Sequence, residues 1–259
     1  MKKVLSLFLA IVMAFSCMML ASCSAKTDSE LVKSKGTLVV GITDFAPMDY
    51  KEDGKWIGFD ADMATLFAEK LGVKVEFVEI EWENKALELK NKSIDCVWNG
   101  MTINDEVKAA MDCSEPYCKN EQVVVLPKAK AAKYKTVEDC KALQFAVEKG
   151  SAGQEEAEAN GFKVTEVLAQ ADALMEVKSG TSDGAVIDLL MAGAMVGEGT
   201  SYANLVKTDI SLSNEEYGVG FRQGSDLVKE INAFFDECRE NGKLEEIATK
   251  YGVQAAVIK

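Results

Sequence analysis

Two successive series of alternating apolar strands and amphipathic helices constrain the fold of this chain most strongly. In the first series, strands are expected at 37–42, 73–77 and 93–98. The second series starts after Pro127, with strands expected at 144–148, 163–168 and 184–187. Strands that alternate with helices form parallel sheets with helical crossovers. The sequence therefore predicts an α/β protein of two lobes, each a sheet flanked by helices.

Helical periodicity and shorter apolar runs predict the remaining elements. Apolar residues spaced four apart indicate a helix over 61–71, with Asp60 at its N-cap. Other helices are expected near 86–89, 136–142, 153–160, 171–178, 226–240 and 243–250. Further strands are expected at 122–126 and 217–222.

The loops that follow the strands are candidate ligand-binding segments. In open α/β sheets, ligands bind at the carboxyl ends of the strands, so two lobes in one chain predict a cleft between them. These loops carry aromatic, carboxylate, hydroxyl and amide side chains, namely Asp44, Phe45, Trp82, Asn99, Thr102, Glu148, Ser151 and Asp188. This mixture suits a small polar ligand.

Composition excludes several classes of function. The chain of 259 residues contains no histidine, which removes Ser-His-Asp and Cys-His catalysis and every zinc site that needs imidazole. A net charge of -13 disfavours nucleic-acid binding, because an acidic surface repels phosphate backbones. We expect no catalytic residue, no bound metal, no cofactor and no nucleic-acid partner.

Residues 1–22 have the form of a secretory signal peptide. A short basic start precedes an apolar stretch from Val4 to Met19. A single transmembrane anchor is the alternative, but this stretch is short of the roughly 20 residues that a spanning helix needs. The ending Leu20-Ala-Ser-Cys23 resembles a bacterial lipobox, in which the cysteine is lipidated and becomes the new N-terminus. Residues 23–30 are then a lipidated tether.

Five cysteines remain beyond Cys23, at positions 96, 113, 118, 140 and 238. Because five is odd, at least one has no intramolecular partner. The sequence leaves open which of them pair. The alternative, which we favour, is that all five are small buried apolar residues.

Five short motifs carry a resemblance to a known family. They are Gly36-Thr-Leu-Val-Val-Gly, Gly58-Phe-Asp-Ala-Asp, Asn99-Gly-Met-Thr-Ile, Ser114-Glu-Pro-Tyr and Gly242-Lys-Leu. In this order they resemble the polar amino-acid-binding family of solute-binding proteins from bacterial ABC importers, solute-binding protein family 3. The resemblance covers about residues 36 to 251.

The resemblance implies a two-lobed, type II periplasmic-binding-protein-like fold with a ligand cleft between the lobes. Lobe 1 would comprise 31–125 and a return segment, 211–259, and lobe 2 would comprise 126–210. It also implies a monomer that captures a polar amino acid or a related cationic solute and delivers it to a membrane permease. The protein would be exported and held by its lipid on the outer face of the cytoplasmic membrane, or in the periplasm of a cell with two membranes.

The resemblance also implies roles for individual residues. Phe45 matches an aromatic residue that lies against the ligand, and Trp82 matches a second wall of the site. Asn99, Gly100 and Thr102 match a segment that donates hydrogen bonds, and Ser151 and Ala152 match a helix N-terminus that favours a carboxylate. Asp188 matches the acid that holds the ligand's α-ammonium group. The alternatives are an ordinary core or surface tryptophan at 82 and a helix N-cap at Asp188, and the N-cap role can coexist with ligand binding.

One position departs from the family pattern. The family places an arginine that grips the α-carboxylate where this chain has Val107 in Thr102-Ile-Asn-Asp-Glu-Val107. Lys108 is adjacent but lacks the planar fork of arginine, and the two arginines, Arg222 and Arg239, fall in a late strand and a C-terminal helix. With Glu148 beside Asp188, we expect an acidic pocket in which carboxylate recognition contributes little.

Two other functions remain open. The same scaffold hosts a dehydratase that acts on small cyclic acids, and Glu148 would be its general acid. A site without arginine suits such a carboxylate-rich substrate poorly. The chain is alternatively a sensor module that reports its ligand to a partner in trans.

The lipobox generates a first prediction. Cys23→Ala should release the protein from membranes, because the lipid is the only apolar attachment expected in the mature chain. Immunoblots of membrane and soluble fractions after detergent-free washes measure the release. Cys17→Ala, inside the segment that is removed, is the matched control and should leave the protein on the membrane. Retention of the Cys23 variant would contradict the lipoprotein interpretation.

Overall fold

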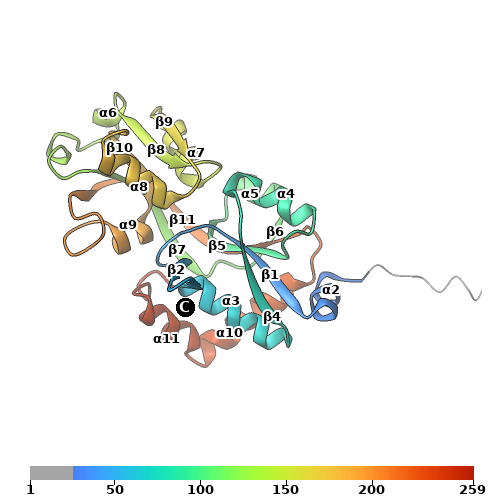
Figure 1. Ribbon diagram of the computed structural model, residues 1–259. Coiled ribbons are helices and arrows are strands. Elements are labelled where there is room, and N and C mark those ends of the chain that lie inside the picture. The colour runs from blue at the N-terminus through green and yellow to red at the C-terminus, as the bar shows by residue number, and fades with distance from the viewer. Residues whose placement is uncertain (1–25) are drawn as a thin grey trace, which may run out of the picture.

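Two lobes joined by two long strands form the structure, a computed structural model that describes residues 26–259 (Figure 1). The expected signal peptide and the expected lipidation site, Cys23, lie outside the described residues. The fold is the expected α/β arrangement, with helices on both sides of each lobe's strands. Within residues 26–259, no helix has the length and apolarity to cross a bilayer.

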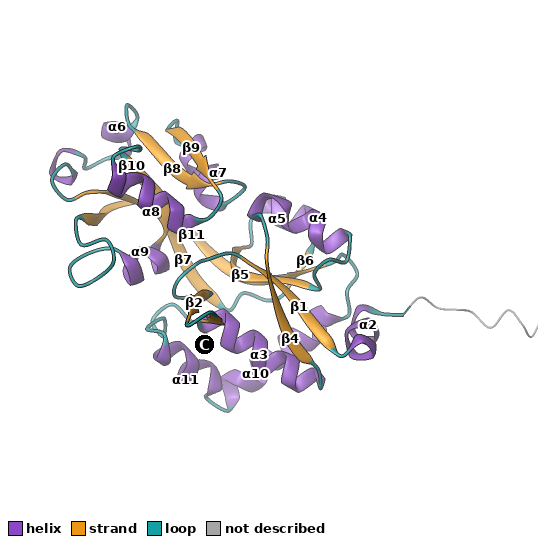
Figure 2. Cartoon of the chain, viewed as in Figure 1, coloured by secondary structure: helices purple, strands orange, loops and turns teal. Residues whose placement is uncertain are grey.

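Lobe 1 contains a parallel set of strands. Strands β1 (Thr37–Ile42), β4 (Lys74–Glu79) and β5 (Cys96–Thr102) pair in the order β4-β1-β5. A small hairpin of β2 (Tyr50–Glu52) and β3 (Lys55–Ile57) precedes helix α3 (Phe59–Leu71). Helices α3, α10 (Leu227–Glu240) and α11 (Lys243–Lys250) lie on one side of these strands. On the other side lie α4 (Lys85–Lys90) and α5 (Asp105–Ala110), as Figure 2 shows.

Lobe 2 repeats the plan with different helices. Strands β10 (Gly184–Asp188), β8 (Gln144–Glu148) and β9 (Lys163–Val167) are parallel neighbours. Helices α7 (Ala152–Ala159) and α8 (Gln170–Ser179) connect them. Two short helices, α6 (Val137–Cys140) and α9 (Leu189–Met195), complete the lobe together with a 3₁₀ turn at Ala131–Lys133.

Strands β7 (Cys118–Pro127) and β11 (Leu205–Phe221) run through both lobes. They pair with each other in antiparallel register. On its other edge, β11 pairs with β5 of lobe 1, and β7 pairs with β10 of lobe 2, both antiparallel. The short strand β6 (Asp112–Cys113) also pairs with β11. The two expected sheets are therefore one hydrogen-bonded path, β4-β1-β5-β11-β7-β10-β8-β9, because the crossing strands pair along most of their length.

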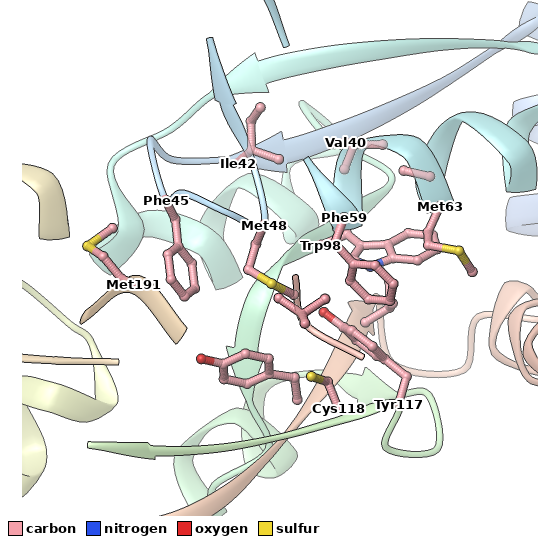
Figure 3. Close-up of a cluster of buried hydrophobic side chains, with 14 of the residues drawn as sticks. Val40, Ile42, Phe45, Met48, Phe59, Met63, Trp98, Tyr117, Cys118 and Met191 are labelled. Carbon is pink, nitrogen blue, oxygen red and sulfur yellow. The ribbon is translucent and has the colours of Figure 1, made fainter. Parts of the chain in front are cut away.

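Aromatic side chains fill the core of lobe 1 (Figure 3). The ring of Phe235 on α10 stacks on Tyr117 at 5.2 Å and meets Trp98 edge-on at 5.6 Å, measured between ring centroids. All three side chains are fully buried. Their burial fixes α10 against the strand β5 that leads into the boundary between the lobes.

Several local expectations need correction. The tether expected through residue 30 overlaps helix α2 (Asp28–Lys35), which begins with a capping box formed by Thr27 and Glu30. Asp60 is not the N-cap of α3. Gly58 is, with a φ of 136° and no room for a Cβ beside the carbonyl of Met48.

The sequence also missed several short elements and half of one long strand. These are α2, the β2–β3 hairpin, α5, β6, α9 and the first half of β11. The five cysteines beyond residue 25 are free, and all except Cys113 are buried.

The aromatic core generates a prediction about stability. Phe235→Ala should lower the free energy of unfolding by about 3–5 kcal/mol, because it removes a ring from a fully packed site. Urea unfolding followed by tryptophan fluorescence measures the change. Leu87→Ala, at a side chain that is 52% exposed, is the control and should stay within about 0.5 kcal/mol of the parent. Equal effects of the two substitutions would contradict this packing.

Candidate functional site

A small cavity of about 30 Å³ lies between the lobes at the carboxyl ends of the strands. Eight of the ten residues predicted from sequence line it, namely Trp82, Asn99, Gly100, Thr102, Glu148, Ser151, Ala152 and Asp188. The carboxyl ends of β5, β8 and β10 and the segments after β4 and β8 bring these residues together. Asn99, Gly100 and Thr102, which were expected in a loop, lie within β5.

Asp44 and Phe45 do not line this cavity. Phe45 is buried, meets Tyr217 edge-on with ring centroids 6.3 Å apart, and lies beside Met191 of lobe 2 in Figure 3. It lies so close to Gly100 that a Cβ on that glycine would come within 2.4 Å of the ring. Asp44 is half-buried, and burial together with the charge of Glu79 raises its pKa.

Asp188 is the most heavily hydrogen-bonded acid of the site. Its carboxylate accepts hydrogen bonds from the amides of Asn120, Gln122 and Gln170 and from the hydroxyl of Tyr217. Asp188 is the N-cap residue of helix α9, as the alternative expected, but its side chain makes no capping hydrogen bond. Burial raises the pKa of Asp188, and these donors act in the opposite direction because they favour the charged form.

A second acid shares two of these donors. Glu215 accepts hydrogen bonds from Asn120 at 2.6 Å and from Gln122 at 2.7 Å. Burial and the charge of Asp188 raise the pKa of Glu215 to about 8. The two amides of β7 therefore lie between two carboxyl groups, that of Asp188 at the end of β10 and that of Glu215 on β11.

Glu148, at the end of β8, is a third buried acid and lines the cavity. Its side-chain oxygen Oε1 has no hydrogen-bond partner among the described residues. Burial and the charge of Asp188 raise the pKa of Glu148 to about 8, while Thr43 and Lys85 act in the opposite direction. The cavity thus has an acidic pole with an unused acceptor.

The N-terminus of helix α7 forms a second pole of the cavity. Ser151 is its N-cap, and the hydroxyl of Ser151 accepts a hydrogen bond from the N–H of Gln154 at 3.1 Å. The first N–H groups of a helix have no intrahelical acceptor, and the helix dipole favours negative charge there. Ala152 begins this helix and lines the cavity, so this pole suits an anionic group.

Lys85 lies between the lobes and was not predicted from sequence. Its ammonium group lies 4.9 Å from the centroid of the Trp82 ring and donates a hydrogen bond to the carbonyl of Gly150 at 2.9 Å. Only 7% of the residue is exposed. Burial lowers the pKa of Lys85, while the charges of Glu106 and Glu148 act in the opposite direction.

The other basic residues considered from sequence do not line the cavity. Val107 lines it and is buried, whereas Lys108 points to the exposed surface and lines a separate groove. Arg222 pairs with Asp28 at 3.0 Å, and Arg239 donates to the carbonyl of Ile258. Both arginines therefore stabilise lobe 1 and do not line the cavity, as we expected from their positions in the sequence.

Sequence reasoning also missed Gln122, Gln170 and Tyr217. Each contacts Asp188. Gln122 and Tyr217 lie inside the crossing strands, and Gln170 begins helix α8 just after the loop that follows β9. The polar side chain of Gln122 in an otherwise apolar strand was the available signal. Among residues 26–259, no group of three or more potential ligand side chains is arranged to hold a metal ion.

Comparison with known proteins gives a consistent family. The model of the bacterial extracellular solute-binding proteins, family 3, matches residues 38–254. The arginine-binding extracellular protein ArtP of Bacillus subtilis is 29% identical over 257 residues, which cover 97% of this chain and 98% of ArtP.

Two solved structures extend the comparison. A substrate-binding protein of an ABC uptake transporter from Streptococcus pneumoniae, solved with bound histidine, is 29% identical and covers 91% of this chain and 100% of its own, with a TM-score of 0.83. The ancestral amino acid-binding protein AncCDT-1, a precursor of cyclohexadienyl dehydratase, is 31% identical and covers 86% of this chain and 98% of its own, with a TM-score of 0.79.

The raised pKa of Glu148 predicts a pH-dependent stability. The stabilising contribution of this group is complete below its ordinary pKa of 4.5 and is lost as the pH rises through about 8, because the folded state holds the proton more tightly. The Glu148→Gln variant lacks this ionisable group. The melting midpoint of the variant minus that of the parent should therefore increase by several degrees from pH 5 to pH 9. About 1 kcal/mol corresponds to about 2–4 °C in a protein of this size.

Differential scanning fluorimetry across this pH range measures the effect. Glu138→Gln, at a side chain that is 79% exposed, is the matched control and should keep a constant offset from the parent. A constant offset for the Glu148 variant as well would contradict a buried, titrating Glu148.

Proposed function

Because this chain belongs to the bacterial extracellular solute-binding proteins of family 3, we propose that it captures a polar amino acid outside the cytoplasm and delivers it to the permease of an ABC transporter. The observation that carries this proposal is the cavity between the lobes, which has an acidic pole and a helix N-terminus. An amino acid carries a positive and a negative group, and these two poles match it.

The acidic pole receives the α-ammonium group. Three of the four donors to Asp188 bind its oxygen Oδ1. The other oxygen, Oδ2, accepts only from Gln170 among the described residues, so it keeps an acceptor position for the ligand. Oε1 of Glu148 offers a second acceptor on the same cavity. A cation placed here also relieves the repulsion that raises the pKa of Glu148.

The remaining predicted residues complete the site around the ligand. Trp82 provides a flat apolar wall, and Thr102 and Gly100 supply hydrogen-bonding groups at the end of β5. Ser151 and Ala152 receive the carboxylate at the N-terminus of α7. Phe45 acts from behind Gly100 as support, and Asp44 stays outside the cavity wall.

The side chain of the ligand is polar and carries positive charge in this proposal. ArtP is named for arginine, and the Streptococcus pneumoniae protein was solved with histidine. In this chain Glu148 adds a second carboxyl group beside Asp188, and this group suits a ligand with two cationic groups.

Binding without chemical conversion is the activity we propose. The relatives are named as binding proteins, and AncCDT-1, although a precursor of a dehydratase, is itself named an amino acid-binding protein. The dehydratase alternative depends on Glu148 as a general acid. Ligand recovered unchanged after incubation, as measured by mass spectrometry, separates a binder from an enzyme.

The protein acts at the outer face of the cytoplasmic membrane in this proposal, as a monomer held by lipid on Cys23. The extracellular family supports export. The lipobox at residues 20–23 supports the anchor. The permease is the partner that takes the ligand, and we do not favour a sensor acting in trans.

A thermal-shift screen of the twenty amino acids tests the proposed function. A ligand at 100 times its Kd should stabilise the folded state by about 2.7 kcal/mol, which raises the melting midpoint by several degrees. Asp188→Asn should then weaken binding at least 100-fold in calorimetry, because a buried ammonium loses its counter-charge.

Asp236→Asn is the control for this variant. Its carboxylate is 64% exposed on helix α10 and pairs only with Arg239, so binding should stay at the parental affinity. Undiminished binding by the Asp188 variant would contradict the proposed site, and the absence of any amino-acid ligand would contradict the proposed function.

A further inference from the structure

Among residues 26–259, Lys85 has the only cationic side chain on the wall of the cavity between the lobes. The wall includes three carboxyl groups, from Glu106, Glu148 and Asp188. Val107, where the resemblance places an arginine, contributes an apolar side chain at this wall. Any positive charge that meets a ligand carboxylate in this cavity therefore has to come from Lys85.

The ammonium group of Lys85 has no carboxylate within ion-pair distance among the described residues. Its hydrogen bonds go to two neutral acceptors, the carbonyl of Gly150 at 2.9 Å and the carbonyl of Trp82 at 3.3 Å. An ammonium group has three N–H donors, so one is left for another acceptor. A buried charge without a counter-charge is costly, and an anion beside it removes that cost.

Lys85 also lies at the correct pole. Gly150, which accepts its hydrogen bond, immediately precedes Ser151 and Ala152 at the N-terminus of helix α7. Gly150 has a φ of 72°, and a Cβ there would come within 2.7 Å of Cα of Glu83, so this loop of lobe 2 packs directly on the 3₁₀ turn that precedes Lys85. The ammonium group and the free N–H groups of the helix thus converge on one end of the cavity.

We propose that Lys85 is the cationic group that binds the carboxylate of the ligand, in place of the arginine that Val107 replaces. This inference rests on the proposed function. It reverses the expectation that carboxylate recognition contributes little. The cavity then has a complete pair of poles, Lys85 with helix α7 for the carboxylate and Asp188 with Glu148 for the ammonium. The resulting ligand class is amino acids with a free α-carboxylate, and amines and amino-acid amides bind more weakly.

A different role would give Lys85 the same contacts. Its hydrogen bond to Gly150 joins the two lobes. Lys85 could therefore act only as a latch, a residue that holds the lobes together and makes no contact with the ligand. Two other contacts join the lobes in the same region, the Lys149–Glu83 ion pair at 3.1 Å and the Asn104–Glu155 hydrogen bond at 2.7 Å. A latch would affect every ligand equally, whereas a carboxylate-binding group affects only ligands that have the carboxylate.

The test compares an amino acid with its own α-carboxamide. The purified exported protein is screened by calorimetry against the twenty L-amino acids, and the strongest binder is paired with its carboxamide. The parent should prefer the acid at least 10-fold. Lys85→Met should weaken binding of the acid about 10- to 100-fold and that of the carboxamide less than 3-fold, so that the preference disappears.

Two matched variants complete the experiment. Lys85→Arg keeps the cation and should keep the preference for the acid. Lys108→Met removes an exposed lysine next to Val107 and should bind both compounds with parental affinity. Far-ultraviolet circular dichroism and melting midpoints establish that each variant is folded.

Each outcome decides the proposal. Equal weakening of acid and carboxamide by Lys85→Met would assign Lys85 to the latch and overturn the inference, while the proposed function stands. A parent that binds the carboxamide as tightly as the acid would also overturn the inference alone. A parent that binds none of the twenty amino acids would overturn the proposed function and this inference with it.

Discussion

The rest of this structure depends on the hydrogen bonds that the side-chain amides of Asn120 and Gln122 donate to two carboxyl groups. Both sit on the crossing strand β7, and each donates to Asp188 of lobe 2 and to Glu215 of the other crossing strand. Buried carboxyl groups persist in a fold only when they are hydrogen-bonded or paired. The same two side chains therefore keep two acids in the interior, join the crossing strands to lobe 2, and set Asp188 at the cavity between the lobes.

Local sequence patterns predicted the helices and strands in which apolar residues recur at regular spacing. Helix α11 has the expected bounds, since apolar and charged residues alternate with helical spacing after Gly242. The first half of β11 was missed because its residues from 207 to 216 are mostly polar, and only pairing with β7 makes them a strand. Eight site residues were found because the carboxyl ends of parallel strands and the segments after them converge. Lys85 and Gln170 were not, since each begins a helix in which nothing local distinguishes it from a surface residue.

The positive charge at the cavity lies on a different helix in this chain than in the family pattern described above. Lys85 begins helix α4 and Val107 lies in helix α5, and both side chains reach the same cavity. Moving a positive charge from one helix to the other keeps the sign of the site and changes its shape, because an ammonium group is a compact point charge and a guanidinium group is a planar fork. The stacking of this ammonium on Trp82 ties the charge to the wall of the site.

Helix α2 has a mechanical consequence. It is fastened to lobe 1 by the Arg222–Asp28 ion pair and by a hydrogen bond from the N–H of Ser29 to Asp226, and it lies on the side of lobe 1 away from lobe 2 (Figure 1). A pull on the chain at residue 26 is therefore borne by lobe 1, and the crossing strands carry no load. Lobe 2 takes no part in these two contacts, so a tether on the N-terminus would pull on lobe 1 and leave the cavity between the lobes unloaded.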